Sequence, residues 1–142
     1  MPMHVNNLGN VFGGVILSMV DKAGALAAMR HARGPTVTVS FDRVEFRLPI
    51  YAGEMVTCRA RITYVGRTSM EIWVCVEAEH PMTGVIRHTN DCYLTFVAID
   101  SNGRPTPVRG LLLETEDERL HFEQGKIRRR SREQLDARLE ER

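Results

Sequence analysis

The residue best suited to chemistry in this sequence is an aspartate, Asp21, inside a long apolar stretch. Residues 11–33 place apolar side chains at helical spacing, and counting in helical steps puts Asp21 on one stripe with Leu17, Gly24 and Ala28. That stripe is expected to pack against the rest of the fold. Because an unpaired buried carboxylate is costly, Asp21 must find donors or take up a proton. Asp21 is therefore a candidate general base or nucleophile. Alternatively, it meets a salt-bridge partner or turns to the edge of the helix.

Asn10, Gly13 and Gly14 precede Asp21 in the chain and offer groups that a carbonyl substrate needs. Asn10 lies in the loop before the helix, so its amide is expected to point toward the helix end that carries Asp21; the alternative is a turn or N-cap residue. Gly13 and Gly14 stand at the helix start, where unpaired N–H groups and the positive dipole end favour a developing oxyanion. A glycine pair also lets an acyl carbonyl approach the backbone, although it can equally be a helix-entry turn.

The elements that must position these residues follow from the hydrophobic period. A helix is expected over residues 13–32, with Gly34 and Pro35 as its stop. From residue 36 to residue 99 the period becomes two, which predicts strands over 36–50, 56–64, 70–76 and 85–99. The apolar face changes parity near Asp42 and Arg43, which predicts a bulge there. One helix followed by an antiparallel meander excludes a parallel, nucleotide-type sheet.

Composition limits the class of protein. The chain has 142 residues, 43% of them hydrophobic, which fits one globular domain with its own core. A net charge of +1 is too small to suggest a nucleic-acid partner. Cys58, Cys75 and Cys92 lack the paired spacing of metal or redox sites and are expected to be buried, reduced thiols. With no apolar run long enough for a membrane span and a polar N-terminus, a cytoplasmic location is expected.

The last segment differs from the rest. Residues 1–113 are expected to form the main domain and residues 114–142 a charged helical extension, with acids early and bases late. These charges are predicted to pair along the helix or with a neighbouring subunit. The alternative is a phosphate-binding role for four late arginines, Arg128, Arg129, Arg130 and Arg132.

Several separated motifs resemble one known family. In chain order they are HVNNLGNVFGG at residues 4–14, MVD at 19–21, GRTSME at 66–71, TFVA at 95–98 and GRP at 103–105. This pattern resembles the hotdog-fold acyl-CoA thioesterases, and within them the branch of YciA-type enzymes and brain acyl-CoA hydrolases. The resemblance runs from about residue 2 to residue 125.

The resemblance implies an α+β hotdog fold, in which a five-stranded antiparallel sheet wraps around one long helix. Its short first strand would come from the first few residues. The family pairs two such units across a two-fold axis, and three dimers commonly form a hexamer. The active site lies between subunits, so a homodimer would carry two equivalent sites.

The resemblance also implies site roles. Asp21 corresponds to the general base or nucleophile, and Asn10 to the residue that orients water or the thioester from the partner chain. Arg67, Thr68 and Ser69 are expected to border the groove for the pantetheine arm of CoA. The implied activity is hydrolysis of acyl-CoA to a free acid and CoA without metal or cofactor, with Gly14 as the oxyanion donor. A non-catalytic acyl-CoA-binding module is the alternative. A CoA-ester dehydratase is a weaker one, and it would need His4 in the site.

Overall fold

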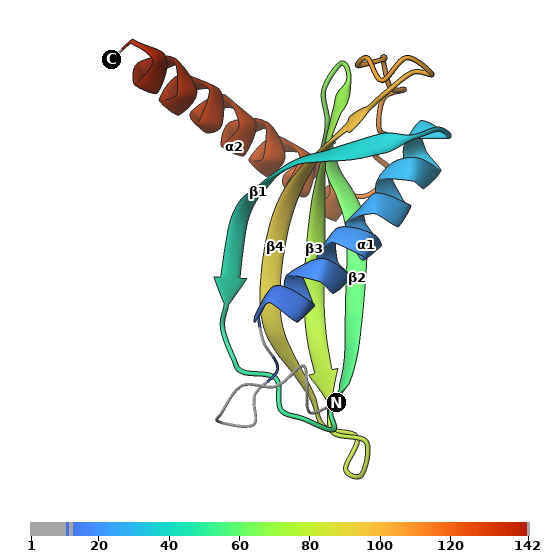
Figure 1. Cartoon of the computed structure of the whole chain (residues 1–142), viewed down its shortest axis with the longest axis vertical. Helices are drawn as coiled ribbons and strands as arrows, with labels where there is room; N and C mark the ends of the chain where they lie inside the picture. The colour runs from blue at the N-terminus through green and yellow to red at the C-terminus, as the bar shows by residue number, and fades with distance from the viewer. Residues whose placement is uncertain (1–10, 12, 142) are drawn as a thin grey trace.

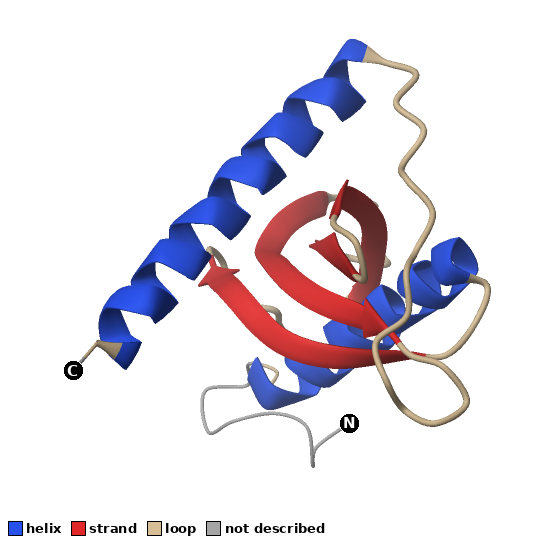
Figure 2. Cartoon of the chain, turned by 90° about the horizontal axis from the view of Figure 1, so that it is seen from above, coloured by secondary structure: helices blue, strands red, loops and turns tan. Residues whose placement is uncertain are grey.

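The computed structural model describes residue 11 and residues 13–141 of the chain. These residues form two helices and four strands: α1 (Gly13–Ala32), β1 (Thr36–Phe46), β2 (Met55–Val65), β3 (Ser69–Glu79), β4 (Ile86–Ala98) and α2 (Glu116–Glu140). The strands make an antiparallel sheet in the order β1-β4-β3-β2. The sheet curves between the two helices, with α1 on one face and α2 crossing the other (Figures 1 and 2). The expected α+β class is confirmed.

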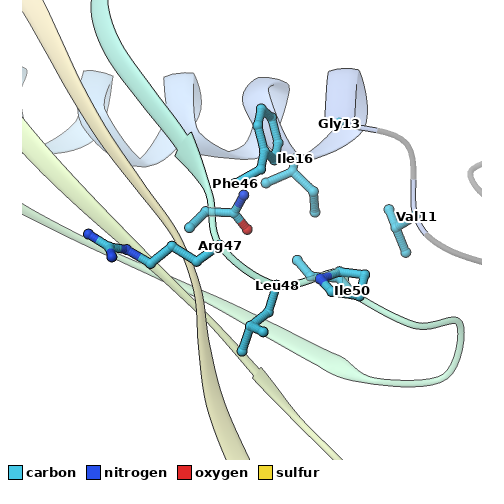
Figure 3. Close-up of a pocket in the computed structure, with 9 residues that line it drawn as sticks. Val11, Gly13, Ile16, Phe46, Arg47, Leu48 and Ile50 are labelled. Carbon is cyan, nitrogen blue, oxygen red and sulfur yellow. The ribbon is translucent and has the colours of Figure 1, made fainter.

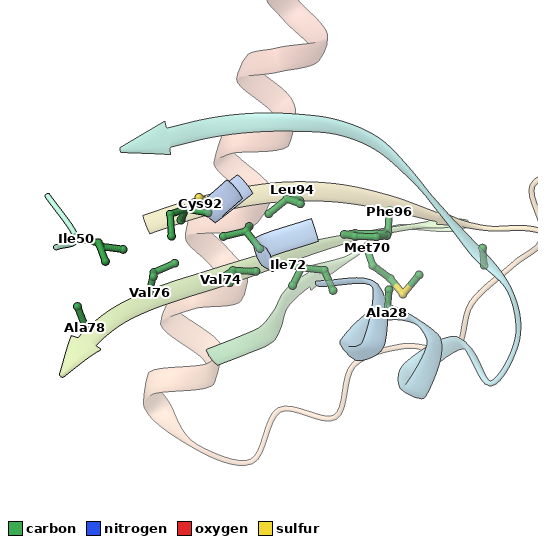
Figure 4. Packing of buried hydrophobic residues seen from close by; sticks show 13 residues of the cluster. Ala28, Ile50, Met70, Ile72, Val74, Val76, Ala78, Cys92, Leu94 and Phe96 are labelled. Atoms are coloured by element: carbon green, nitrogen blue, oxygen red, sulfur yellow. The ribbon is translucent and has the colours of Figure 1, made fainter. Parts of the chain in front are cut away.

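Helix α1 has the predicted bounds and packs its small residues against the sheet. Its buried residues are Ile16, Val20, Gly24 and Ala28. A Cβ added at Gly24 would stand 3.0 Å from the ring of Phe96, so this glycine permits the close approach of helix and sheet. The core under α1 is formed mainly by β3 and β4 (Figure 4), through Met70, Ile72, Val74, Val76, Ala78, Cys92, Leu94, Phe96 and Ala98.

The end of α1 differs slightly from the expected glycine stop. The residue in the left-handed conformation is Arg33, with φ of 55°, and its N–H donates to the carbonyl of Met29. Gly34 precedes Pro35, and a residue before proline is restricted to extended conformations. The left-handed turn therefore falls one residue earlier, on a side chain that adopts it less readily than glycine.

The strand order corrects the expected meander. Strands β2, β3 and β4 follow one another, but β1 pairs with β4 and lies at the edge. Residues 47–54 between β1 and β2 include Pro49 and are too many for a tight hairpin, so the chain crosses to the far edge. β1 also ends at Phe46, short of the predicted residue 50. The described residues contain four strands where the resemblance implies five; the first residues, the expected source of the fifth, lie outside them.

The predicted bulge is confirmed. The register between β1 and β4 shifts between Phe41 and Arg43, which restores the apolar face across the parity change. A second shift, between Thr38 and Ser40, was not predicted. Both shifts bend the strand that runs beside α1.

Helix α2 begins at an N-cap, Thr115, whose hydroxyl accepts from the N–H of Glu118 at 3.1 Å. It packs on the sheet at Gly125, where an added Cβ would lie 2.8 Å from both Glu71 Oε1 and Tyr64 Cβ. Some α2 charges pair along the helix, as predicted, but Arg128 reaches the sheet and binds Glu71. Among the described residues, no helix combines the length and apolar character that a membrane crossing requires.

Candidate active site

Asp21 lies on the side of α1 that faces β1. Its Oδ1 accepts a hydrogen bond from Thr38 Oγ1 at 2.7 Å, and its side chain is half-buried. In front of it is an open groove of about 340 Å³ whose lining is mainly apolar, formed by Gly14, Leu17, Ser18, Asp21, Phe41 and Val44. With one hydrogen-bond donor among the described residues and an open groove, the carboxylate retains lone pairs that a substrate or water can use.

The position of Asp21 corrects the predicted stripe. Gly24 and Ala28 are buried as expected, but the stripe continues through Val20 and Ile16 instead of Asp21 and Leu17. The helix is therefore rotated, and Asp21 lies at its edge, which is the alternative left open by the sequence. This rotation avoids the cost of a fully buried charge while leaving one oxygen within reach of a strand hydroxyl.

The two glycines at the helix start face different surroundings. Gly14 lines the groove of Asp21, and a Cβ added there would meet no atom of the described residues within 4 Å. Gly13 faces the ring of Phe46, and an added Cβ would stand 3.2 Å from it. The open space at Gly14 leaves room for a carbonyl beside the first N–H groups of α1, which have no partner within the helix.

Thr38 is a site residue that the sequence analysis missed. Strand β1 returns directly beside α1 after the short Gly34–Pro35 turn, so a hydroxyl early in β1 comes within reach of Asp21, in the third turn of the helix. The signal was a threonine between Val37 and Val39, in a segment where polar and apolar residues alternate. Alternation alone marks it as the polar side of a strand and does not identify what it faces.

The structure does not bring Arg67, Thr68 and Ser69 into the groove of Asp21. Two of their carbonyls are used within the fold: Arg67 O accepts from Val108 N at 2.9 Å and Thr68 O from Ala98 N at 3.0 Å. Ser69 lines a separate cleft of about 570 Å³ beside α2, and its hydroxyl accepts from Arg129 at 3.0 Å. Within one chain, these residues and Asp21 therefore belong to different surfaces.

Asn10 and His4 lie outside the described residues, so their predicted roles stay predictions. The phosphate-binding alternative for the late arginines finds three of them already paired with acids. Arg128 binds Glu71 through two hydrogen bonds, of 3.0 and 2.6 Å. Arg129 pairs with Glu133 along α2, and Arg132 lies 3.5 Å from Asp42.

The three thiols are unsuited to nucleophilic chemistry. All are free, and burial raises the pKa of Cys58, of Cys75 and, to about 11, of Cys92. A thiol with a raised pKa holds little thiolate at neutral pH. The predicted burial is confirmed for Cys92 but is wrong for Cys58 and Cys75, which are half-buried.

One cluster of possible metal ligands lies on the outer face of the sheet. The ligand atoms of Cys75, His88 and Asp91 lie within 4.8 Å of one another. The Asp91 carboxylate already accepts from Trp73 Nε1 at 2.8 Å and Arg47 Nε at 2.9 Å, and His88 Nε2 lies 3.0 Å from it. With both oxygens engaged and a guanidinium alongside, the cluster is a hydrogen-bonded network around Asp91.

Comparisons with known proteins bear on this geometry. The family model of the Thioesterase superfamily matches residues 8–85. A Bacillus subtilis protein named uncharacterized acyl-CoA thioester hydrolase YkhA is 44% identical over 117 residues, which cover 82% of this chain and 68% of that protein. The cytosolic acyl coenzyme A thioester hydrolase of Rattus norvegicus is 35% identical over 84% of this chain, but the match covers only 32% of that protein.

Solved structures that are similar in fold to this chain are also acyl-CoA thioesterases or hydrolases. An apo-hexameric acyl-CoA thioesterase is 36% identical, with a TM-score of 0.91 over 96% of this chain and 88% of that one. An acyl-CoA hydrolase from Staphylococcus aureus, solved with butyryl coenzyme A, is 30% identical, with a TM-score of 0.87 over 98% of this chain and 86% of that one. Variants of that protein with one asparagine, one aspartate or one threonine replaced by alanine have also been solved.

Proposed function

This chain belongs to the thioesterase superfamily, and from that premise we propose that it hydrolyses acyl-CoA to a free carboxylic acid and CoA, with Asp21 at the reacting carbon. The observation that carries the proposal is the half-buried Asp21 carboxylate, held by one donor among the described residues beside an open groove along the first half of α1. The sheet curved around α1 is the hotdog fold of the acyl-CoA thioesterases.

The groove suits attack on a thioester. The carbonyl oxygen lies at the start of α1, where the Gly14 N–H and the helix dipole stabilise the oxyanion of the tetrahedral intermediate. In one route Asp21 takes a proton from water, and the water oxygen bonds to the carbonyl carbon. In the other the Asp21 carboxylate attacks the carbon itself, and water then hydrolyses the mixed anhydride. In both routes the C–S bond breaks and CoA leaves as a thiolate, which then takes up a proton.

The two routes differ in which molecule receives the oxygen atom of water. Single turnover in H₂¹⁸O leaves the protein unlabelled if water attacks the thioester. If an anhydride forms and water attacks its aspartyl carbon, the label enters Asp21, and mass spectrometry of the peptide detects it. Water attack on the acyl carbon of an anhydride leaves no label in Asp21, so trapping with hydroxylamine is the companion measurement.

Thr38 orients Asp21. In the Staphylococcus aureus protein the replaced threonine lies seventeen positions after the replaced aspartate. Thr38 lies seventeen positions after Asp21 and donates to it. The matching spacing supports a working Asp–Thr pair in this chain, in which the hydroxyl fixes one carboxylate oxygen so that the other faces the groove.

The asparagine of the site comes from the segment before α1. Our assignment is Asn10, which would orient water or the thioester. The Staphylococcus aureus variants introduce a second candidate, because there the replaced asparagine precedes the replaced aspartate by fifteen positions. In this chain that position is Asn6. Separate Asn10→Ala and Asn6→Ala variants decide between them: the functional asparagine is the one whose loss lowers kcat without lowering the melting temperature.

Two copies of the chain share each site. Among the described residues β1 is an edge strand with one neighbour, and it exposes three apolar side chains, Val37, Val39 and Phe41, of which Phe41 lines the groove of Asp21. Such an edge favours pairing with a second copy. Three dimers would make the hexamer, the state named for a structural relative. Mixing Asp21→Ala chains with chains lacking the asparagine should restore part of the activity; no recovery in verified mixed dimers would contradict a shared site.

CoA lies along Arg67, Thr68 and Ser69. These three residues belong to the subunit that faces the groove of Asp21 from the other side of the dimer. Arg67 is exposed at the turn between β2 and β3, where its guanidinium is accessible to a phosphate. Arg67→Ala should raise KM for acyl-CoA but not for the same acyl group on pantetheine, which lacks the nucleotide. An equal rise for both thioesters would place Arg67 away from the nucleotide.

The reaction needs no metal or organic cofactor under this proposal, because the oxyanion donors and the base belong to the protein. Hydrolysis should therefore persist after exhaustive chelation. A cytoplasmic location is proposed as well, supported by the three free thiols and by the rat relative named as cytosolic.

A further inference from the structure

A second hollow lies on the other side of the first turn of α1. It has a volume of about 300 Å³ and lies between the helix start and the segment that follows β1 (Figure 3). Most of its lining is apolar, from Val11, Ile16, Phe46, Leu48, Pro49 and Ile50. The remaining lining residues are Gly13, Arg47 and one buried amide, Asn90.

The Asn90 side chain is unusual among the buried polar groups. It is 2% exposed, and within the described part of the chain its Oδ1 has no hydrogen-bond partner. Its buried neighbour Thr89, by contrast, donates to the carbonyl of Val76. Buried polar atoms are nearly always paired, and an unpaired one costs free energy unless something else satisfies it. This amide faces a hollow, so a ligand is the natural partner.

The hollow adjoins the groove of Asp21. Gly13 and Ile16 line the hollow, and the next residues, Gly14 and Leu17, line the groove. A thioester carbonyl bound at the helix start therefore has the carboxylate on one side and the hollow on the other. The apolar walls suit the carbon chain of the acyl group.

We propose that this hollow receives the acyl group and that Asn90 selects acyl groups that carry a hydroxyl beyond the α-carbon. The substrate hydroxyl donates its hydrogen bond to Asn90 Oδ1 at the buried end of an otherwise apolar site. This inference rests on the proposed acyl-CoA hydrolysis and adds its substrate class.

The lining favours a neutral substituent over a carboxylate. Arg47 is the cation of the hollow, but its guanidinium binds Asp91 at 2.9 Å and Glu45 at 2.7 Å. In Figure 3 its head extends away from the labelled apolar side chains. An acyl chain ending in a charge would thus meet apolar walls and one neutral amide. A hydroxyl, by contrast, donates the hydrogen bond that the amide oxygen accepts.

The test compares hydrolysis of 3-hydroxybutyryl-CoA, 4-hydroxybutyryl-CoA and butyryl-CoA by the full chain and by Asn90→Leu. At least one hydroxyacyl substrate should exceed butyryl-CoA in kcat/KM, and Asn90→Leu should lower that ratio by about tenfold or more, since the group that recognises the hydroxyl is gone. Thr89→Val is the matched control: it removes a buried hydroxyl that already has its partner, and the ratio should stay as in the parent.

Stability provides a second measurement. Because leucine removes the Oδ1 that has no partner among the described residues, Asn90→Leu should raise the melting temperature by about 2 °C or more at equal protein concentration. A lowered melting temperature would show that the amide is paired within the protein and would overturn the proposal. An unchanged substrate ratio in a folded Asn90→Leu protein would overturn it too.

The experiment distinguishes failure of the proposed hydrolysis from failure of the proposed selection by Asn90. If no acyl-CoA is hydrolysed, that function fails, and the hollow is then judged by calorimetric binding of the same three thioesters. A preference for a hydroxyacyl thioester that Asn90→Leu removes would still support selection by Asn90. Equal affinities would overturn it.

Discussion

Two carboxylates on opposite sides of the sheet show how one residue type serves two purposes. Glu71, under α2, is 3% exposed and accepts from Thr63 at 2.6 Å and from two nitrogens of Arg128. Asp21, on α1, is half-buried and accepts from Thr38 alone among the described residues. A carboxylate whose lone pairs are satisfied holds the structure together, while one with a single donor and an open groove is free to act on a substrate.

The strongest test of this contrast is Glu71→Gln. It removes the charge that pairs with the partly buried Arg128, and breaking a buried ion pair from one side costs about 3 kcal/mol or more. The free energy of unfolding, measured with denaturant at fixed protein concentration, should fall by that amount. Glu123→Gln, on an exposed part of α2, the helix that carries Arg128, is the control and should change stability little. Equal effects would mean that the Glu71 network is not structural.

Asp21→Asn should show the opposite behaviour. Losing the base or nucleophile should lower kcat by about a hundredfold or more, while the melting temperature stays near that of the parent. Thiol release from acyl-CoA measures the rate. Ser18→Ala changes another side chain of the same groove and should retain most of the activity. Parent-like turnover by Asp21→Asn would remove this residue from the chemistry.

Thr38→Val tests whether the hydrogen bond from Thr38 to Asp21 matters. Without the hydroxyl the carboxylate can rotate away from the reacting carbon, so kcat should fall by about tenfold, the scale of one lost hydrogen bond to a charged group. Thr38→Ser keeps the hydroxyl and should recover most of the rate. If serine and valine variants are equally slow, Thr38 acts through packing and not by orienting Asp21.

The smallest expected effect concerns acid stability on the α2 side of the sheet. Burial alone would raise the pKa of Asp91, but hydrogen bonds from Trp73 and Arg47 outweigh it and lower the pKa below its ordinary 3.8. Stability from this group is complete above that value and is lost as the pH falls through the lower, folded-state pKa. Denaturant unfolding from pH 5 to pH 2 should therefore show a decline that is shallower in Asp91→Asn. Part of the decline should remain, because Glu54 also has a lowered pKa. Identical slopes in the two proteins would contradict this assignment.

Local sequence patterns were sufficient to place helix α1 and the bulge in β1. The helical period placed α1 at its observed bounds, and the parity change at Asp42 predicted the bulge. Both depend on side-chain spacing along one segment, which the chain carries in itself. The pairing of β1 with β4 could not be read in the same way, because it depends on which edge is free after β2, β3 and β4 have paired.

The sequence by itself determined the family, most of the elements and the presence of an aspartate within the long helix. Only the tertiary structure decided the rotation of α1, which sets Asp21 at the edge beside Thr38, and the hollow lined by Asn90, whose Oδ1 has no partner among the described residues. The reason is physical: spacing fixes which residues share a face, but the direction in which that face points is settled by the packing of the whole core, where apolar burial on one side must balance the solvation of a charge on the other.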